Sequence, residues 1–233
     1  MYPHRYKFGK QTTILSSAEF QIAVNNAIDK GATPEQIAYC IVLWNWGFRK
    51  SEAYERVISD VVITETAVLI DAHERKKHGL QVPAVEVQRG WFGIEEYLIP
   101  WALERESAKP TKKRIFYQQP TGKFTRTEPT AQRPKGTRVE VKVRASRVEK
   151  AVWLFPHIAS TSAWTAVKLV LGEKYYPHFC RLEKLSKVAK TAQNMGDMIG
   201  AVRRVSGLKS LNAMEAYFGD DEEVGSKAMR ESE

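Results

Sequence analysis

The sequence predicts a mainly α fold, in which two helical regions flank a small basic antiparallel β insertion and an acidic disordered tail follows. Helix start and stop signals recur through residues 1–107, and apolar residues return at steps of three and four after about residue 159. Between them, the helical periodicity stops and a period-two alternation appears. With 233 residues, 43% of them hydrophobic, the chain can bury a core without disulfides or metal.

Residues 1–107 are predicted to form an N-terminal helical domain. Ser16 and Ser17 precede "AEFQIAVNNAIDKG", and Thr33-Pro34 precedes "EQIAYCIVLWNWG", which places a cap residue before a proline at the first helical position. Gly31 and Gly47 are the predicted ends of these two helices.

Two further helical segments are predicted to complete this domain. The third helix follows Ser51 and runs through "EAYERVISDVVITETAVLIDAHERKKHG", where Val57, Val61 and Val68 belong to an apolar stripe at helical spacing. A fourth, broken helical region, "AVEVQRGWFGIEEYLIPWALERESA", is rich in aromatic residues and is expected to pack on the first three.

Residues 108–150 form a basic segment that we call the arm. From Lys109 to Lys150 it carries thirteen Lys and Arg but three acids. Within it, "RVEVKVR" (138–144) alternates valines with charged residues, which is typical of a strand with one buried face. "KRIFYQ" and "KFTRT" flank Pro120-Thr121-Gly122, a predicted hairpin turn. We therefore expect a two- or three-stranded β element with a loop at 129–137, docked on the helices.

Residues 151–219 are predicted to form a C-terminal helical region. "STSAWTAVKLVLG" has a Ser/Thr start and a glycine stop, and "RLEKLSKVAKTAQNMGDMIGAVRRVSG" carries a long apolar stripe. Lys184, Lys187 and Lys190 fall mostly off that stripe and predict a basic outer face. The tail 220–233, "DDEEVGSKAMRESE", is polar, acidic and predicted to be disordered.

The sequence predicts no catalytic residues, no metal site and no cofactor. The histidines of "HERKKH", residues 73–78, are five apart and fall on different sides of a helix. Cys40 and Cys180 lie in apolar helical patterns, and we interpret His178 and Cys180 in "YPHFC" as a core pair. An enzyme acting on nucleic acid is disfavoured because carboxylates that could hold metal are not clustered. The prediction is therefore that the protein is not an enzyme.

The local excess of positive charge predicts a non-enzymatic nucleic-acid-binding protein that contacts mainly phosphates through the arm. Aromatic rings interleave with the cations of the arm, which favours base stacking as well. The candidate binding residues come from the arm and from the basic helix face: Lys112, Lys113, Arg114, Tyr117, Lys123, Phe124, Arg126, Arg133, Lys135, Arg138, Lys142, Arg144, Lys184, Lys187 and Lys190.

A small viral or phage nucleoprotein or packaging factor has this profile, with helical faces left for homo-oligomer formation. DNA and RNA both remain open as the partner. The alternative is a structural assembly protein whose basic arm binds an acidic face of a neighbouring subunit. The N-terminal residues lack the apolar core of a signal peptide, and no apolar run approaches the roughly 20 residues of a membrane span. We expect a soluble protein, cytoplasmic or within a virion, not secreted and without a membrane partner.

Overall fold

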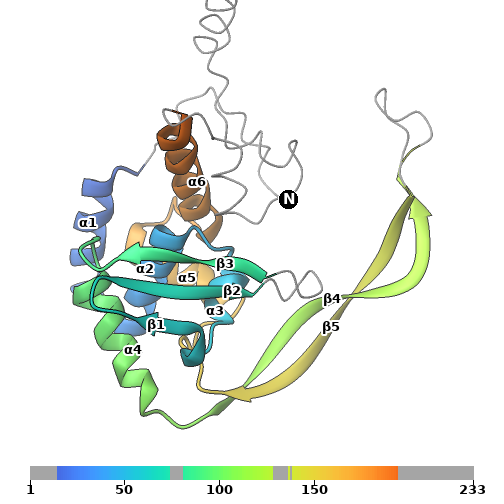
Figure 1. Cartoon of the computed structure of the whole chain (residues 1–233), viewed down its shortest axis with the longest axis horizontal. Helices are drawn as coiled ribbons and strands as arrows, with labels where there is room; N and C mark the ends of the chain where they lie inside the picture. Colours follow the sequence, from blue (N-terminus) through green and yellow to red (C-terminus); the bar gives the residue numbers. More distant parts are fainter. Residues whose placement is uncertain (1–14, 74–80, 128–135, 137, 194–233) are drawn as a thin grey trace, which may run out of the picture.

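The computed structural model describes residues 15–73, 81–127, 136 and 138–193. Its elements follow one another in the order α1 (Ser17–Asn25), α2 (Pro34–Trp46), α3 (Lys50–Tyr54), the 3₁₀ turn η1 (Ile58–Asp60), β1 (Val61–Ile63), β2 (Ala67–His73), β3 (Gln81–Gln88), the π-helical turn η2 (Ile94–Leu98), α4 (Ile99–Glu106), β4 (Thr111–Arg126), β5 (Arg138–Ala151), α5 (Ser162–Leu171) and α6 (Pro177–Gln193) (Figure 1). Among the described helices, none combines the length and the apolar character that crossing a bilayer requires.

The prediction of a mainly α fold is wrong, because the described residues form two antiparallel sheets beside the helices. The segment predicted as the third helix is helical only over the five residues of α3 and then enters β1 and β2. β3 pairs with β2 and takes up the start of the predicted fourth helix. Residues 57–70 are dense in β-branched residues, which favour strands. Pairing in the three-stranded sheet buries Val68, Ile70 and Val87.

Helix α2 lies at the centre of the core. It starts at Pro34 after the cap residue Thr33, as the sequence indicates, and ends at Gly47, whose φ of 65° is left-handed. Its residues are apolar on nearly every side, which suits a helix enclosed by other elements. One hydrophobic cluster joins α2 to residues from α1, the three-stranded sheet, α4, α5 and α6. Trp46 donates an indole N–H to the Val85 carbonyl of β3 at 2.8 Å and so ties the sheet to α2.

The arm is a long two-stranded ribbon that extends away from the body of the protein (Figure 1). β4 and β5 pair from Thr111 with Ala151 at the base to Arg126 with Arg138 at the far end. The hairpin turn predicted at Pro120–Gly122 is wrong: these residues lie inside β4, at a shift in register, with Gly122 at a φ of 71°. Most of the predicted loop 129–137 lies outside the described residues.

The base of the arm is fixed in the body by a buried lysine. The Lys113 side chain is 8% exposed, and its Nζ donates to the carbonyls of Tyr54 at 2.6 Å and Phe155 at 2.7 Å. The same nitrogen lies over the rings of Tyr54 and Trp153, at 5.2 and 5.3 Å from their centroids. Trp153 in turn donates its indole N–H to the Thr111 carbonyl at 2.9 Å. These contacts join the first residues of β4 to α3 and to the segment after β5.

Lys113→Ala is expected to destabilise the protein by about 2 kcal/mol, because it leaves two buried carbonyls without their donor. For a chain of this length, the melting temperature should fall by about 4 to 8 °C. The neighbouring Lys112 is exposed, so Lys112→Ala is the matched control and should leave the melting curve unchanged. Equal melting temperatures for the two variants would contradict the proposed anchor.

Candidate phosphate-binding site

Two arginines meet where the turn between α2 and α3 packs against the start of α6. Arg49 is the residue that precedes α3, two positions after Gly47 ends α2. Arg181 lies in the first turns of α6, is only 2% exposed, and donates from Nη1 to the Gly47 carbonyl at 2.7 Å. The left-handed Gly47 therefore turns the chain so that Arg49 comes next to α6.

Glu52 of α3 holds the two guanidinium groups together. It forms an ion pair with Nη1 of Arg49, accepts the Arg49 backbone N–H at 2.7 Å, and lies 3.6 Å from Nη1 of Arg181. Burial alone would raise the pKa of Glu52, but the charges of Arg49 and Arg181 and the hydrogen bonds from Arg49 outweigh it. The pKa of Glu52 is therefore lowered, and the carboxylate stays ionised between the arginines.

His178 lies beside the same two arginines. It is three residues before Arg181 on α6, a spacing that brings both side chains to one face of the helix. Loss of ring hydration lowers the pKa of His178 first, and the positive charges of Arg181 and Arg49 lower it further. At neutral pH this imidazole is uncharged, so one ring nitrogen accepts a proton while the other donates.

We call Arg49, His178 and Arg181 the arginine cluster. The two guanidinium groups keep their positive charge at neutral pH and share the Glu52 carboxylate. The Arg49 side chain is 31% exposed, which opens the cluster to solvent. Paired guanidinium groups match the geometry of phosphate oxygens, and a neutral histidine beside them can transfer a proton. This arrangement suits a phosphodiester.

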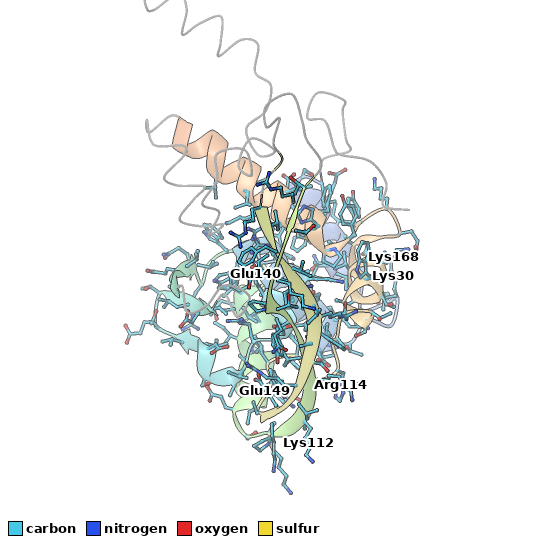
Figure 2. The ribbon with its side chains drawn as sticks, turned by 90° about the vertical axis from the view of Figure 1, so that its right-hand side faces the viewer. Lys30, Lys112, Arg114, Glu140, Glu149 and Lys168 are labelled. Carbon is cyan, nitrogen blue, oxygen red and sulfur yellow. The ribbon has the colours of Figure 1, made fainter. Side chains whose placement is uncertain are left out.

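The register of the arm separates its side chains onto two faces, since residues paired across an antiparallel ribbon point to the same side. Figure 2 shows the labelled Arg114 and Glu149 on opposite sides of the ribbon. The cationic face of the arm, defined by this register, carries Lys112, Arg114, Arg126, Arg138, Lys142, Arg144 and Lys150 with one acid, Glu140.

Two rings on the cationic face lie under arginines. The Arg144 guanidinium is 4.1 Å from the centroid of Phe116, and that of Arg138 is 4.1 Å from that of Phe124. Tyr117 points to the opposite face, under Arg147 at 5.6 Å. That opposite face also carries exposed valines in its outer half: Val139, Val141 and Val143.

The remaining predicted binding residues have other surroundings. Lys113 is buried at the base of the arm, Lys123 lies in the register shift of β4, and Arg133 and Lys135 lie outside the described residues. On α6, the Lys184 ammonium lies 4.2 Å from the Trp91 ring, and that of Lys187 lies 4.4 Å from Trp44. Burial, followed by the charge of Lys187, lowers the pKa of Lys184 to about 8. Lys190 follows on the same helix.

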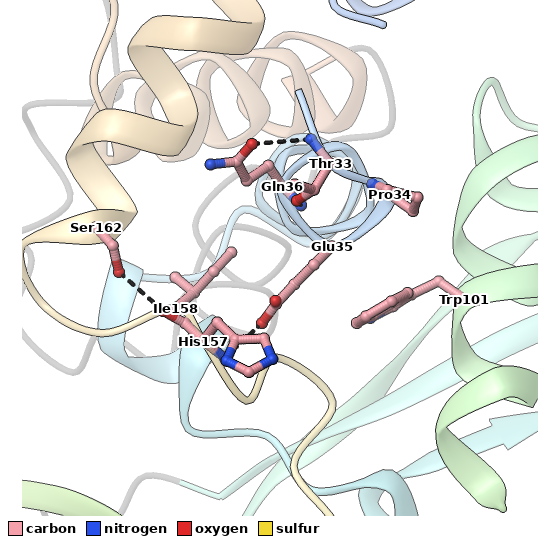
Figure 3. A pocket seen from close by; sticks show the side chains of 8 residues that line it. All are labelled: Thr33, Pro34, Glu35, Gln36, Trp101, His157, Ile158 and Ser162. Carbon is pink, nitrogen blue, oxygen red and sulfur yellow. Dashed lines mark hydrogen bonds between the residues drawn. The ribbon is translucent and has the colours of Figure 1, made fainter. Parts of the chain in front are cut away.

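A separate cleft of about 350 Å³ lies at the start of α2, lined by Glu35, Trp101, His157 and other residues (Figure 3). The Glu35 carboxylate accepts the backbone N–H of His157 at 2.8 Å. A buried carboxylate repels an anion, so this cleft does not suit a phosphate. In the part of the chain that the structure describes, no three His, Cys, Asp or Glu side chains gather to hold a metal ion.

No family model and no curated protein matches the sequence. The fold is similar to that of a site-specific recombinase. The solved structure in question is the XerH site-specific recombinase bound to its difH substrate in a pre-cleavage complex, with a TM-score of 0.54 and 18% identity. The similarity covers 97% of this chain and 54% of XerH, so the chain spans about half the length of that protein. At this identity, the comparison shows a shared fold.

The prediction that the protein is not an enzyme is contradicted by this similarity, because XerH is a site-specific recombinase and therefore an enzyme. The sequence shows no clustered carboxylates, whereas the arginine cluster is assembled from α6 and from the turn before α3. His178 and Arg181 carried one available signal, a three-residue spacing that brings two side chains to one face once α6 begins at Pro177, before the predicted helix start. Arg49 carried none, since only the packing of α6 against Gly47 brings it to them.

Glu52→Gln is expected to destabilise the protein by about 3 kcal/mol at pH 7, because it removes a carboxylate that pairs with the buried Arg181 and with Arg49. The lowered pKa of Glu52 means that the ionised form stabilises the fold above pH 4.5, and that this stability is lost as the pH falls below 4.5. Denaturation curves should therefore show wild type and variant converging in acid.

Glu95→Gln is the control, since Glu95 forms an exposed ion pair with Arg89 and surface pairs contribute little. A gap between wild type and Glu52→Gln that stays constant from pH 7 to acid would contradict the assigned ionisation of Glu52.

Proposed function

We propose that the protein is a DNA-binding enzyme that cleaves a DNA strand at a phosphodiester held by the arginine cluster. One observation carries the proposal: Arg49 and Arg181 meet at Glu52, and both arginines act on His178, in a fold similar to that of a site-specific recombinase. The recombinase is bound to its substrate in a pre-cleavage complex, which favours DNA over RNA as the partner. This proposal replaces the expectation of a nucleoprotein that only coats nucleic acid.

The chemistry of strand cleavage explains why arginines serve this role. As a nucleophile attacks the phosphorus, negative charge grows on the oxygens that surround it, and fixed cations stabilise that charge. A guanidinium keeps its charge at any physiological pH and presents parallel N–H donors. His178, with its lowered pKa, exchanges a proton with the attacking or leaving oxygen.

Glu52 is a positioning residue in this proposal. Its carboxylate fixes both guanidinium groups before substrate arrives, so that binding does not have to order two long side chains. Self-association of the protein remains a prediction.

Arg181→Gln and Arg49→Gln should each reduce the rate of strand cleavage by about 100- to 1000-fold, the usual cost of removing one donor to a developing oxyanion. The substrate is first selected from a random duplex library by binding to wild type. Cleavage is then measured on denaturing gels, which separate a free nick, expected if water attacks, from DNA attached to protein, expected if a side chain attacks.

Arg89→Gln is the matched control, because Arg89 is paired with Glu95 on the surface. It belongs neither to the arginine cluster nor to the cationic face of the arm. It should cleave like wild type. Wild-type protein that binds the selected DNA and never breaks a strand would overturn the proposed activity, and so would full cleavage by Arg49→Gln and Arg181→Gln.

A further inference from the structure

The arm carries a strong positive charge of its own, because none of its cations belongs to the arginine cluster. On its cationic face, seven Lys and Arg accompany the single acid Glu140. This face is opposite to the one that buries Lys113 and Ile115 in the body. Repulsion among so many cations costs stability unless a polyanion lies against them.

Two of these cations are held in position rather than free to rotate. Phe116 and Phe124 each support a guanidinium at 4.1 Å, for Arg144 and Arg138 respectively. An arginine stacked on a ring keeps its N–H edge outward and loses less conformational freedom on binding phosphate. An arginine of the arm itself thus lies over each ring, and both guanidinium groups are presented on the cationic face.

The base of the arm and the arginine cluster both contact helix α3, since Lys113 of β4 donates to the Tyr54 carbonyl and Glu52 pairs with Arg49. Burial, followed by the charge of Glu55, raises the pKa of Tyr54 to about 12, while a hydrogen bond with Ser160 and the charge of Arg144 on the arm oppose that rise. Tyr54 ends α3, the helix that Arg49 precedes. Lys50, at the start of α3, donates to the Ser160 hydroxyl at 3.0 Å and adds a cation between the two regions. Helix α3 therefore lies between the arginine cluster and the base of the arm.

We propose that the cationic face of the arm binds the phosphate backbone of duplex DNA that extends beyond the phosphodiester at the arginine cluster. The inference rests on the proposed function for its choice of DNA. The outer part of β5, from Arg138 to Ser146, spans roughly 30 Å at about 3.3 Å per residue, which corresponds to about nine base pairs. The arm thereby lengthens the bound site without reading its sequence.

The experiment compares the full chain with a variant in which Arg126, Arg138, Lys142 and Arg144 are all changed to Gln. Affinity for a duplex of about 40 base pairs of arbitrary sequence is measured as a function of salt concentration. Each lost phosphate contact lowers the slope of log affinity against log salt by about 0.9, so the slope should fall by about 2 to 4. Melting curves establish that the variant is folded.

The matched control replaces Val139, Val141 and Val143, on the opposite face, with Thr, and it should keep the wild-type slope. An unchanged slope in the Gln variant overturns the proposal, as does an equal fall in the Thr variant. If the Gln variant keeps its slope but no longer self-associates in sedimentation, the arm binds a neighbouring subunit instead.

Measuring strand cleavage on the selected substrate distinguishes a failure of the arm proposal from a failure of the enzyme proposal. If the salt slope falls in the Gln variant but wild type cleaves no strand, DNA binding by the arm is supported and the proposed strand cleavage is overturned. If cleavage depends on Arg181 but the salt slope of the Gln variant is unchanged, the proposed enzyme activity is supported and the proposed contact of the arm with DNA is overturned. Wild-type protein that binds no duplex overturns both.

Discussion

The contact of one carboxylate, Glu52, with two guanidinium groups is the interaction on which the arrangement of the site depends. Arg181 is nearly fully buried, and a buried arginine without a partner would cost several kcal/mol. Its ion pair with Glu52 and its hydrogen bond to Gly47 offset that cost. The same contacts tie α6 to the turn between α2 and α3, so the residues that orient Arg49 also hold the helix that carries His178.

The chain therefore places positive charge in two different environments. In the arginine cluster, the shared Glu52 carboxylate fixes the positions of the two guanidinium groups, and such preorganisation suits the proposed chemistry at a single phosphate. On the arm, the cations stay exposed and two of them rest on phenylalanine rings. Exposed cations are screened by salt and contribute through their number, which suits contact with a long polyanion.

The sequence predicted some of this and missed the rest for physical reasons. Local signals located α2, because Thr33-Pro34 and Gly47 define its ends without help from the rest of the chain. The segment after Ser51 was assigned to a helix because its apolar spacing fits a helical stripe, whereas the pairing of β1, β2 and β3 over long range favours strands. The arginine cluster was missed because charge counts cannot show which of the chain's cations packing brings together.

Helix α3 links the two positively charged regions, although it is only five residues long. Arg49 precedes it, Glu52 lies within it, and the carbonyl of its last residue, Tyr54, accepts a hydrogen bond from Lys113 at the base of the arm. The same short helix therefore contacts the base of the arm through Tyr54 and Arg49 through Glu52. Since a helix this short has little stability of its own, its geometry depends on contacts at both ends. In this fold, helix α3 therefore contributes both to anchoring the arm, through Tyr54, and to ordering the arginine cluster, through Glu52.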